Sequence, residues 1–114
     1  MDLAVLIYKI TGEFPKEELF GLVSQMRRAS VSISSNISEG YARFSDKEFI
    51  RFLQIALGSA AELETQIELS FRLTFLSEEN RHISNNLTQE VSKMLTSLIN
   101  NKNRTIELKQ GKKA

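Results

Sequence analysis

The sequence contains no cysteine and no tryptophan, and it has one proline and one histidine among its 114 residues. The absence of cysteine excludes disulfides, thiolate metal sites and a cysteine nucleophile, and it makes a cytoplasmic location the default expectation. His82, as the only histidine, gives little basis for a histidine-rich metal centre or a Ser-His-Asp triad. Gly40 and Gly58 lack the neighbours of a P-loop or a dinucleotide fingerprint. We therefore expect no enzymatic activity, no metal and no cofactor.

Long apolar runs and a strong overall charge are also missing. No stretch approaches the roughly 18 apolar residues of a membrane-spanning helix, and the N-terminal residues lack the basic start and cleavage site of a signal peptide. The net charge of +1 conceals an uneven distribution. Residues 102–114 carry five basic residues against Glu107, a net +4, which leaves −3 for residues 1–101. Such a segment either attracts phosphates or is a solvated end, and we expect residues 105–114 to form a basic, disordered tail.

Apolar residues recur at steps of three and four over most of the chain. Together with the scarcity of proline and glycine, this spacing predicts an all-α protein. Breaks at TGEFP, YARFSD and LSEEN divide the chain into four helices, with expected ranges of 2–11, 16–42, 46–75 and 78–102. The short connections favour an antiparallel up-down-up-down four-helix bundle over residues 1–104.

Two of the helix starts have specific capping signals. Ser45 is followed three residues later by Glu48, a capping box that starts a helix at about Asp46. Phe44 is placed to pack on Phe49 as a hydrophobic staple. Ser77 precedes two glutamates and predicts the next helix start. The expected core stripe of that last helix is Ile83, Leu87, Val91, Met94 and Leu98.

The segment from Arg27 to Arg43 is rich in serine and poor in strong helix formers, yet its apolar and small residues keep helical spacing. We interpret it as an inner helix whose small side chains let it pack on two sides. Its outward stripe is polar and consists of Gln25, Arg28, Ser32, Ser35, Glu39 and Arg43, with Asn36 at the edge. The stripe is either a seam against another subunit or a surface for a phosphate backbone, and Glu39 favours the seam.

The third helix has more apolar surface than one core requires. The additional residues are Ile50, Ile55, Leu57, Leu69 and Leu73. They predict a second buried face, for which another copy of the chain is the first candidate. Within the same helix Gly58 begins the run GSAA, whose small residues predict close helix packing.

Cations spaced by four lie around the corner between the second and third helices. Arg43, Lys47 and Arg51, together with Arg27 and Arg28, are the best candidate cationic surface outside the tail. Because a single exposed cation contributes little, only copies in an oligomer would sum to a strong field.

The order RRA-x-x-SI-x-x-NI-x-EG from Arg27 to Gly40, followed by EFIRFLQIALGSAAELETQI, resembles a known family. These are the four-helix-bundle proteins encoded in intervening sequences of bacterial 23S rRNA genes, related to accessory proteins of diversity-generating retroelements. The resemblance spans about Tyr8 to Leu76. The matching residues are Phe14, Pro15, Glu18, Leu22, Gln25, Arg27, Arg28, Ala29, Ser32, Ile33, Asn36, Ile37, Glu39, Gly40, Phe52, Leu53, Ala56, Gly58, Ser59, Glu62, Leu63 and Glu64.

The resemblance implies a ring-shaped homopentamer of four-helix bundles, with no catalytic activity assigned. It also implies packing or subunit-contact roles for the motif residues Gln25, Ser32, Asn36, Glu39, Gly40, Gly58 and Glu62. Retroelement members bind nucleic acid and a reverse transcriptase through a strongly basic surface, so RNA, DNA and such a protein are candidate partners here. Members usually have a longer first helix, so either Met1 is an internal start or about two turns have been lost.

Two hypotheses follow. In the first, the chain is a non-enzymatic oligomer that binds nucleic acid or a nucleoprotein through Arg27, Arg28, Arg43, Lys47, Arg51 and the basic tail. In the alternative, the same positions form subunit and partner contacts, and the protein is an interaction scaffold that binds no nucleic acid.

Overall fold

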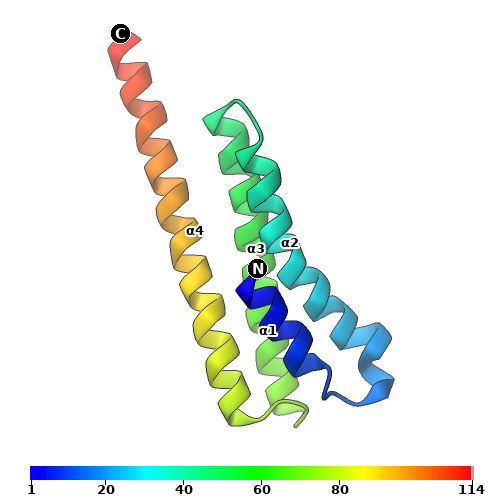
Figure 1. Ribbon diagram of the computed structural model, residues 1–114. Coiled ribbons are helices and arrows are strands. Elements are labelled where there is room, and N and C mark those ends of the chain that lie inside the picture. The colour runs from blue at the N-terminus through cyan, green and yellow to red at the C-terminus, as the bar shows by residue number, and fades with distance from the viewer. Residues whose placement is uncertain (114) are drawn as a thin grey trace.

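The computed structural model describes residues 1–113, and these residues are helical with no strand (Figure 1). Its elements are α1 (Asp2–Thr11), a 3₁₀ turn η1 (Lys16–Glu18), a π-helical turn η2 (Leu19–Val23), α2 (Ser24–Tyr41), α3 (Asp46–Arg72) and α4 (Glu78–Lys113). The predicted all-α class with four helices is confirmed. The molecule is elongated, with extents of 59 × 22 × 18 Å.

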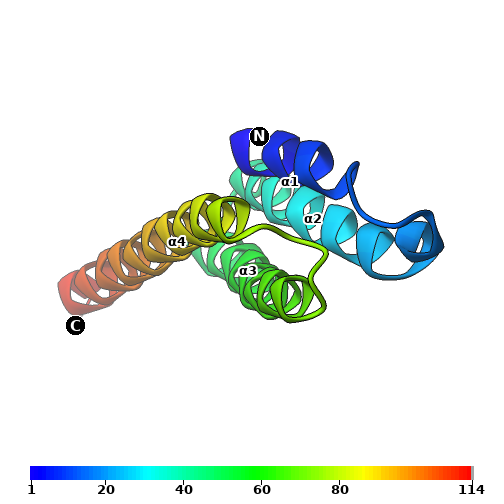
Figure 2. The ribbon, with the colours of Figure 1, turned by 90° about the horizontal axis from the view of Figure 1, so that it is seen from below.

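The long helices α2, α3 and α4 lie side by side in that order, and the short α1 completes the arrangement at one end. Figure 2 shows α1 and α3 on opposite sides of the molecule, with α2 and α4 between them. Helix α1 has 10 residues against 27 in α3, so it covers only part of the length of its neighbours. The molecule therefore has a four-helix half, which contains α1, and a three-helix half, which contains the α2–α3 loop.

The capping signals predicted both helix starts correctly. The Ser45 hydroxyl accepts from the Glu48 amide at 3.3 Å, and the Ser77 hydroxyl accepts from the Asn80 amide at 3.1 Å. The staple prediction was wrong. Phe44 is fully exposed, and the Phe49 ring instead meets Tyr41 edge-on, with the ring centroids 6.2 Å apart.

The predicted helix at 16–42 is not continuous. Gly21 has non-helical dihedral angles (φ −107°, ψ −108°) and lies inside the π-helical turn η2, which joins the 3₁₀ turn η1 to α2. Glycine has weak helix propensity because its backbone loses the most conformational freedom on folding. As a result, Leu19 and Phe20 lie exposed at this break instead of continuing the core stripe of α2.

Helix α3 ends at Arg72, three residues before the predicted end. The Phe75 amide donates to the Ser70 carbonyl and the Thr74 amide to the Phe71 carbonyl, at 2.9 and 3.0 Å. This is the Schellman pattern, with Thr74 in the left-handed conformation (φ 66°) that glycine usually supplies. The end was not recognised in the sequence because a threonine stands in the glycine position.

The prediction of a disordered tail was wrong for the described residues, because α4 continues to Lys113. Ile106 packs against the core, and Lys102 and Lys109 each approach Asp46 to 3.7 Å. These contacts hold the basic end of the chain against the start of α3. Ala114, the last residue of the predicted tail, lies outside the described residues.

One apolar core joins all four helices. Its buried members are Leu3, Ile7, Ile10, Phe14, Leu22, Val23, Met26, Ala29, Ile33, Ile50, Leu53, Ala56, Ala60, Leu63, Ile67, Leu76, Leu95 and Ile99. The α4 contribution differs from the predicted stripe, because Ile83 and Met94 are about half exposed while Ser84 and Thr88 are buried. Both buried hydroxyls donate to carbonyls of their own helix, at 2.6 and 2.7 Å, so their burial leaves no donor unpaired.

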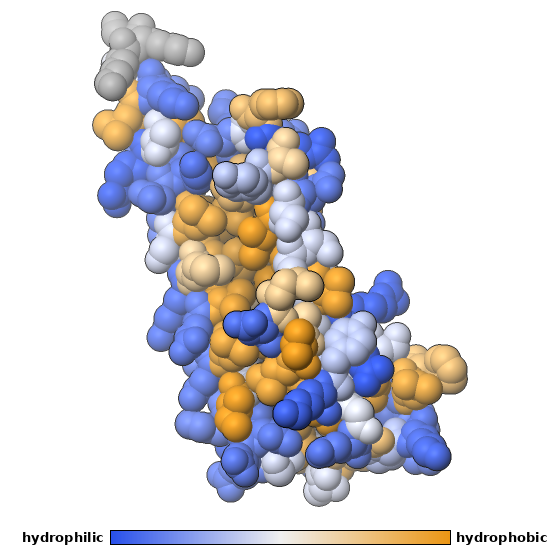
Figure 3. Space-filling view, viewed as in Figure 1, coloured by the Kyte–Doolittle hydropathy of each residue, from blue (hydrophilic) through white to orange (hydrophobic). Residues whose placement is uncertain are grey.

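Beyond the N-terminus of α1 the core is open to solvent. Figure 3 shows an apolar strip between α4 and the neighbouring helices in this region. A groove of about 280 Å³ lies there, and its apolar lining is Met1, Leu3, Ile33, Ile37, Leu87, Val91 and Met94. Leu87, Val91 and Met94 of the predicted α4 stripe therefore face a position that no helix of the described chain occupies.

Candidate nucleic-acid and subunit interfaces

The five predicted cations do not form a single surface. Arg27 is a structural residue: its Nε donates to the Thr11 hydroxyl at 3.0 Å, and its guanidinium lies 4.6 Å from the centre of the Tyr8 ring. These contacts fasten α1 to α2. Arg27 is half-buried in this position, so it contributes less to a binding surface than the sequence predicted.

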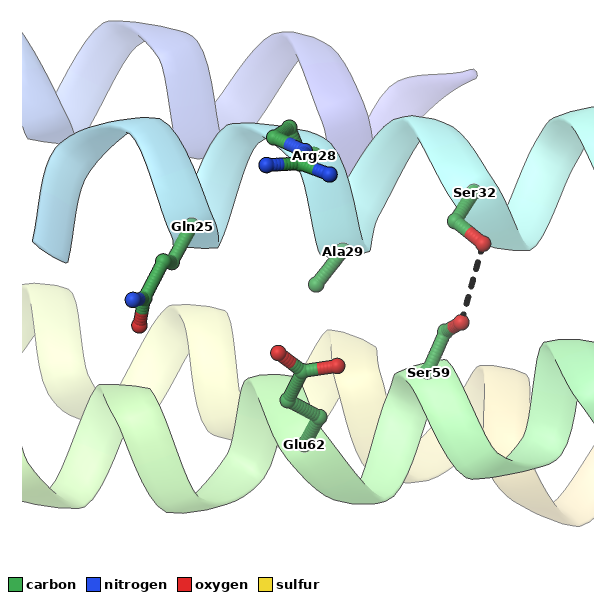
Figure 4. A pocket seen from close by; sticks show the side chains of 6 residues that line it. All are labelled: Gln25, Arg28, Ala29, Ser32, Ser59 and Glu62. Atoms are coloured by element: carbon green, nitrogen blue, oxygen red, sulfur yellow. Dashed lines mark hydrogen bonds between the residues drawn. The ribbon is translucent and has the colours of Figure 1, made fainter. Parts of the chain in front are cut away.

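Arg28 lies in a polar groove between α2 and α3, well away from the α2–α3 loop. The groove has a volume of about 440 Å³ and is lined by Gln25, Arg28, Ala29, Ser32, Ser59 and Glu62 (Figure 4). The hydroxyls of Ser32 and Ser59 are 3.0 Å apart and connect the two helices. The small side chains at this crossing let α2 and α3 approach closely. Ser32 therefore contacts α3 of its own chain, whereas its spacing predicted a position on the outward stripe of α2.

One atom beside the polar groove is unpaired. Gln66 is buried, and its Nε2 donates to Glu62 Oε1 at 3.1 Å. Its Oε1 has no hydrogen-bond partner in the described part of the chain. A buried amide oxygen without a donor is costly, typically by about 1–3 kcal/mol. The groove itself presents the exposed charges of Arg28 and Glu62, and the Gln66 oxygen lies buried behind Glu62.

The remaining motif residues have distinct roles in α2 and α3. Asn36 donates to the Ser32 carbonyl at 2.8 Å, and Glu39 pairs with Arg43 at 2.7 Å. A Cβ on Gly40 would lie 2.7 Å from Phe52 Cβ, so only glycine permits this approach of α2 to α3. A Cβ on Gly58 would meet nothing within 4 Å, so the predicted packing role of Gly58 is not found within the chain.

The structure brings two basic features of the sequence to one end of the molecule. The C-terminal half of α4 passes the α2–α3 loop (Figure 1), and Lys102 and Lys109 meet Asp46 in the first turn of α3. We call this region the basic corner. It comprises Arg43, Phe44, Asp46, Lys47, Arg51, Lys102 and Lys109. Lys102 and Lys109 were not recognised as corner residues, because the helix was expected to end at about 102.

Aromatic rings position the cations of the basic corner. The guanidinium groups of Arg43 and Arg51 lie 5.0 and 5.7 Å from the centre of the Phe52 ring, and Lys102 Nζ lies 5.8 Å from that of Phe49. Arg51 also pairs with Glu48 at 3.4 Å. Lys47 is exposed and has no ion pair among the described residues. Arg43, Lys47, Arg51, Lys102 and Lys109 thus outnumber the carboxylates of Glu39, Asp46 and Glu48.

At the other end of the molecule, charges are balanced in a local cluster. Glu68 accepts from Arg72 at 3.2 Å and from Arg81 at 3.4 Å. The hydrogen bond from Arg72, aided by Arg81, lowers the pKa of Glu68 below its ordinary value of 4.5. The Arg81 guanidinium lies 4.1 Å from the centre of the Phe71 ring. Arg81 also approaches Glu78 at 3.9 Å. Two arginines thus face two glutamates, and the cluster connects α3 to α4 without an excess of positive charge.

The described residues contain neither a candidate membrane span nor a candidate metal site. Among residues 1–113, no helix has an apolar stretch long enough to cross a membrane. No three acidic or histidine side chains in the same range are grouped closely enough to hold a metal ion.

Comparison with known proteins supports the resemblance seen in the motifs. Residues 1–97 match the family described as 23S rRNA-intervening sequence protein. A solved structure from Bacteroides thetaiotaomicron VPI-5482, described as a protein of unknown function from the S23 ribosomal protein family, superposes with a TM-score of 0.78. It is 34% identical, and the match covers 86% of this chain and 92% of that one. No curated protein matches the chain. The chain belongs to the 23S rRNA-intervening sequence protein family.

Proposed function

We propose that this protein is a non-enzymatic, oligomeric nucleic-acid-binding protein that contacts phosphates through the basic corner. The observation that carries the proposal is the convergence of Arg43, Lys47 and Arg51 with Lys102 and Lys109 of α4. Most sequence-independent affinity for nucleic acid comes from neutralising phosphates, which requires such a local excess of cations. Residues 1–101 carry a net −3, so the attachment of the basic end of α4 creates this excess at one place.

Self-association would bring several copies of the basic corner together and strengthen their positive electrostatic potential. We propose an up-down-up-down bundle that assembles into a ring, and the family resemblance suggests five copies. The short loops at 42–45 and 73–77 support the bundle order. The exposed Ile55 and Leu69 of α3, with Leu73 at its C-cap, support a second buried face, and the polar groove around Arg28 and Glu62 supports a subunit contact.

The direct test is the binding of fluorescent RNA and DNA at increasing salt. We expect binding to weaken by roughly 100-fold between about 50 and 200 mM salt if about four phosphates are neutralised. The triple variant Arg43→Glu, Lys47→Glu, Arg51→Glu should lose nearly all binding. The matched control is Lys9→Glu, Lys16→Glu, Lys93→Glu, which makes the same charge change at exposed lysines outside the corner. Equal losses in both variants, or no binding by the wild type at low salt, would refute the proposal.

A second candidate is a protein-interaction scaffold, and the open apolar groove beside Met94 is the observation that favours it. A reverse transcriptase is one candidate partner. In this case the wild type would bind no nucleic acid, and Arg28→Glu, in the polar groove, would change the mass of the oligomer in solution. Light scattering of the wild type and this variant distinguishes the two candidates.

A further inference from the structure

We infer that the basic corner binds unpaired nucleotides, with the Phe44 ring as a stacking surface for a base. The inference rests on the proposed function and specifies which kind of nucleic acid the corner takes. It depends on an exposed aromatic ring, on the charges around that ring and on a contrast with a second exposed ring at the other end of the molecule.

Phe44 is 109% exposed, the highest value among the large apolar residues of the described chain. The Phe44 ring does not pack on Phe49 as the hydrophobic staple that its sequence position favours, because the Phe49 ring is in edge-on contact with Tyr41. Phe44 also lines a hollow of about 330 Å³ between the α2–α3 loop and α4. The ring thus stands at the entrance of a concave surface.

The surroundings of Phe44 suit a phosphate chain better than an apolar protein surface. The hollow is lined by Ser45, Asp46, Lys47 and Lys109, and Ile106 is its only other large apolar residue within the described part. Arg43 precedes Phe44 and is held against the Phe52 ring at 5.0 Å. Proteins that bind single strands combine cations that follow the phosphates with aromatic rings on which bases stack.

The geometry also favours unpaired over paired nucleotides. In a duplex both faces of each base are covered by its neighbours, so a protruding phenylalanine has no base face to contact. An unpaired base can stack on the ring while its flanking phosphates reach Lys47 and Lys109. Tyr41, the last residue of α2, is also largely exposed and lies two residues before Arg43, which places a second aromatic side chain near the same surface.

Phe20 provides the contrast. It is 93% exposed at the Gly21 break, in the other half of the molecule. Its neighbours in sequence include Glu17 and Glu18, so phosphates would be repelled there. Exposure alone therefore does not make a stacking site, and Phe20 is the matched control for Phe44.

The experiment uses the full chain and two probes of equal length, a fluorescein-labelled 20-nucleotide oligo(dT) and a 20-base-pair duplex. We expect the single strand to bind more tightly than the duplex. Phe44→Ala should weaken single-strand binding by about 30-fold, the middle of the range for a stacked base, with little change in its salt dependence. Phe20→Ala should change binding by less than about twofold.

A spectroscopic readout separates stacking from an indirect effect. The natural chain has no tryptophan, so Phe44→Trp and Phe20→Trp each introduce a unique fluorophore. Oligo(dT) should quench the tryptophan at position 44 and leave that at position 20 unchanged.

The outcomes distinguish this inference from the proposed function. If the charge-reversal triple abolishes binding while Phe44→Ala does not change it, the corner binds phosphates but the stacking inference is wrong. If duplex and single strand bind equally and position 44 is not quenched, the inference is also wrong. If the wild type binds neither probe at low salt, the proposed function is wrong, and the stacking inference that rests on it is wrong as well. If Phe44→Ala changes the oligomer mass, Phe44 is a subunit contact and the inference is overturned.

Discussion

The four-helix half and the three-helix half of this molecule are built from the same long helices but differ in how their core is closed. In the four-helix half, α1 buries Ile7 completely against a core that includes Met26 and Ile67, and Arg27 fastens it to α2. In the three-helix half no described element takes the place of α1, and Met94 remains 52% exposed beside an open groove. The ten residues of α1 therefore decide which part of the bundle core is covered and which part is open to solvent.

Charge follows the same division. Glu68 and Glu78 balance Arg72 and Arg81 in the four-helix half, whereas the basic corner of the three-helix half keeps an excess of cations. Under the proposed function, stability and binding would be assigned to opposite ends, as expected where functional surfaces are drawn from the less densely packed parts of a fold. Four predictions test this contrast, from the largest expected effect to the smallest.

Truncation of apolar side chains should affect the two halves very differently. Ile7→Ala removes a fully buried side chain and should lower the free energy of unfolding by about 2–4 kcal/mol. Met94→Ala, in the open groove, should cost less than about 1 kcal/mol because its side chain is already half in water. Urea unfolding followed by circular dichroism measures both. A large loss for Met94→Ala in a monomeric sample would contradict the open groove.

The two motif glycines should respond in opposite directions to alanine. Gly40→Ala places a methyl group 2.7 Å from Phe52 Cβ and should destabilise the protein by about 1–3 kcal/mol. Gly58→Ala meets nothing within 4 Å and should stabilise α3 by about 0.5–1 kcal/mol.

Thermal unfolding of the two glycine variants, at a concentration where both have the same oligomeric mass, tests the contrast. If Gly58→Ala instead dissociates an oligomer, Gly58 serves a subunit contact, as the family motif implies.

Thr74 stores strain at the closed end of the molecule. Its φ of 66° is unfavourable for a β-branched residue and suits glycine. Thr74→Gly should therefore raise the stability by about 1 kcal/mol, with Ser77→Gly as a control that instead removes a helix cap. Differential scanning calorimetry of both variants compares the two effects. A destabilised Thr74→Gly would show that Thr74 does not hold this conformation in solution.

The smallest expected effect is the pH response of Glu68. Hydrogen bonds from Arg72 and Arg81 lower its pKa, so its contribution to stability is present above its ordinary pKa of 4.5. That contribution should be lost as the pH falls from about 4.5 through the lowered value. The stability difference between the wild type and Glu68→Gln should shrink over this acid range. A Glu68 carboxyl that titrates at or above 4.5 by NMR would contradict the cluster.

Much of the fold could be read from local signals. Ser45 and Ser77 predicted helix starts that the structure confirms to the residue, and the three-and-four spacing of apolar residues predicted the all-α class. The break at Gly21 and the helix end at Thr74 were missed. In both cases the helical spacing of apolar residues continues past the point where the backbone leaves the helix, so the pattern gave no warning.

The candidate site was less predictable than the fold. Arg43, Lys47 and Arg51 were recognised together because they follow one another along the chain. Lys102 and Lys109 could not be assigned to the same place, since their position depends on the direction and length of α4. Arg27 was assigned to the binding surface because the sequence does not reveal its contacts with Tyr8 and Thr11.

The sequence by itself determined the all-α class, the number of helices, two of their starts and the family. Caps, periodic spacing and motifs are local features, so they can be recognised without knowledge of packing. Only the tertiary structure decided which half of the core is sealed, that Phe44 faces solvent and that the basic end of α4 lies against the start of α3. These features depend on contacts between residues far apart in the chain. The charge pattern fixes how many cations are available, but helix packing decides where they meet.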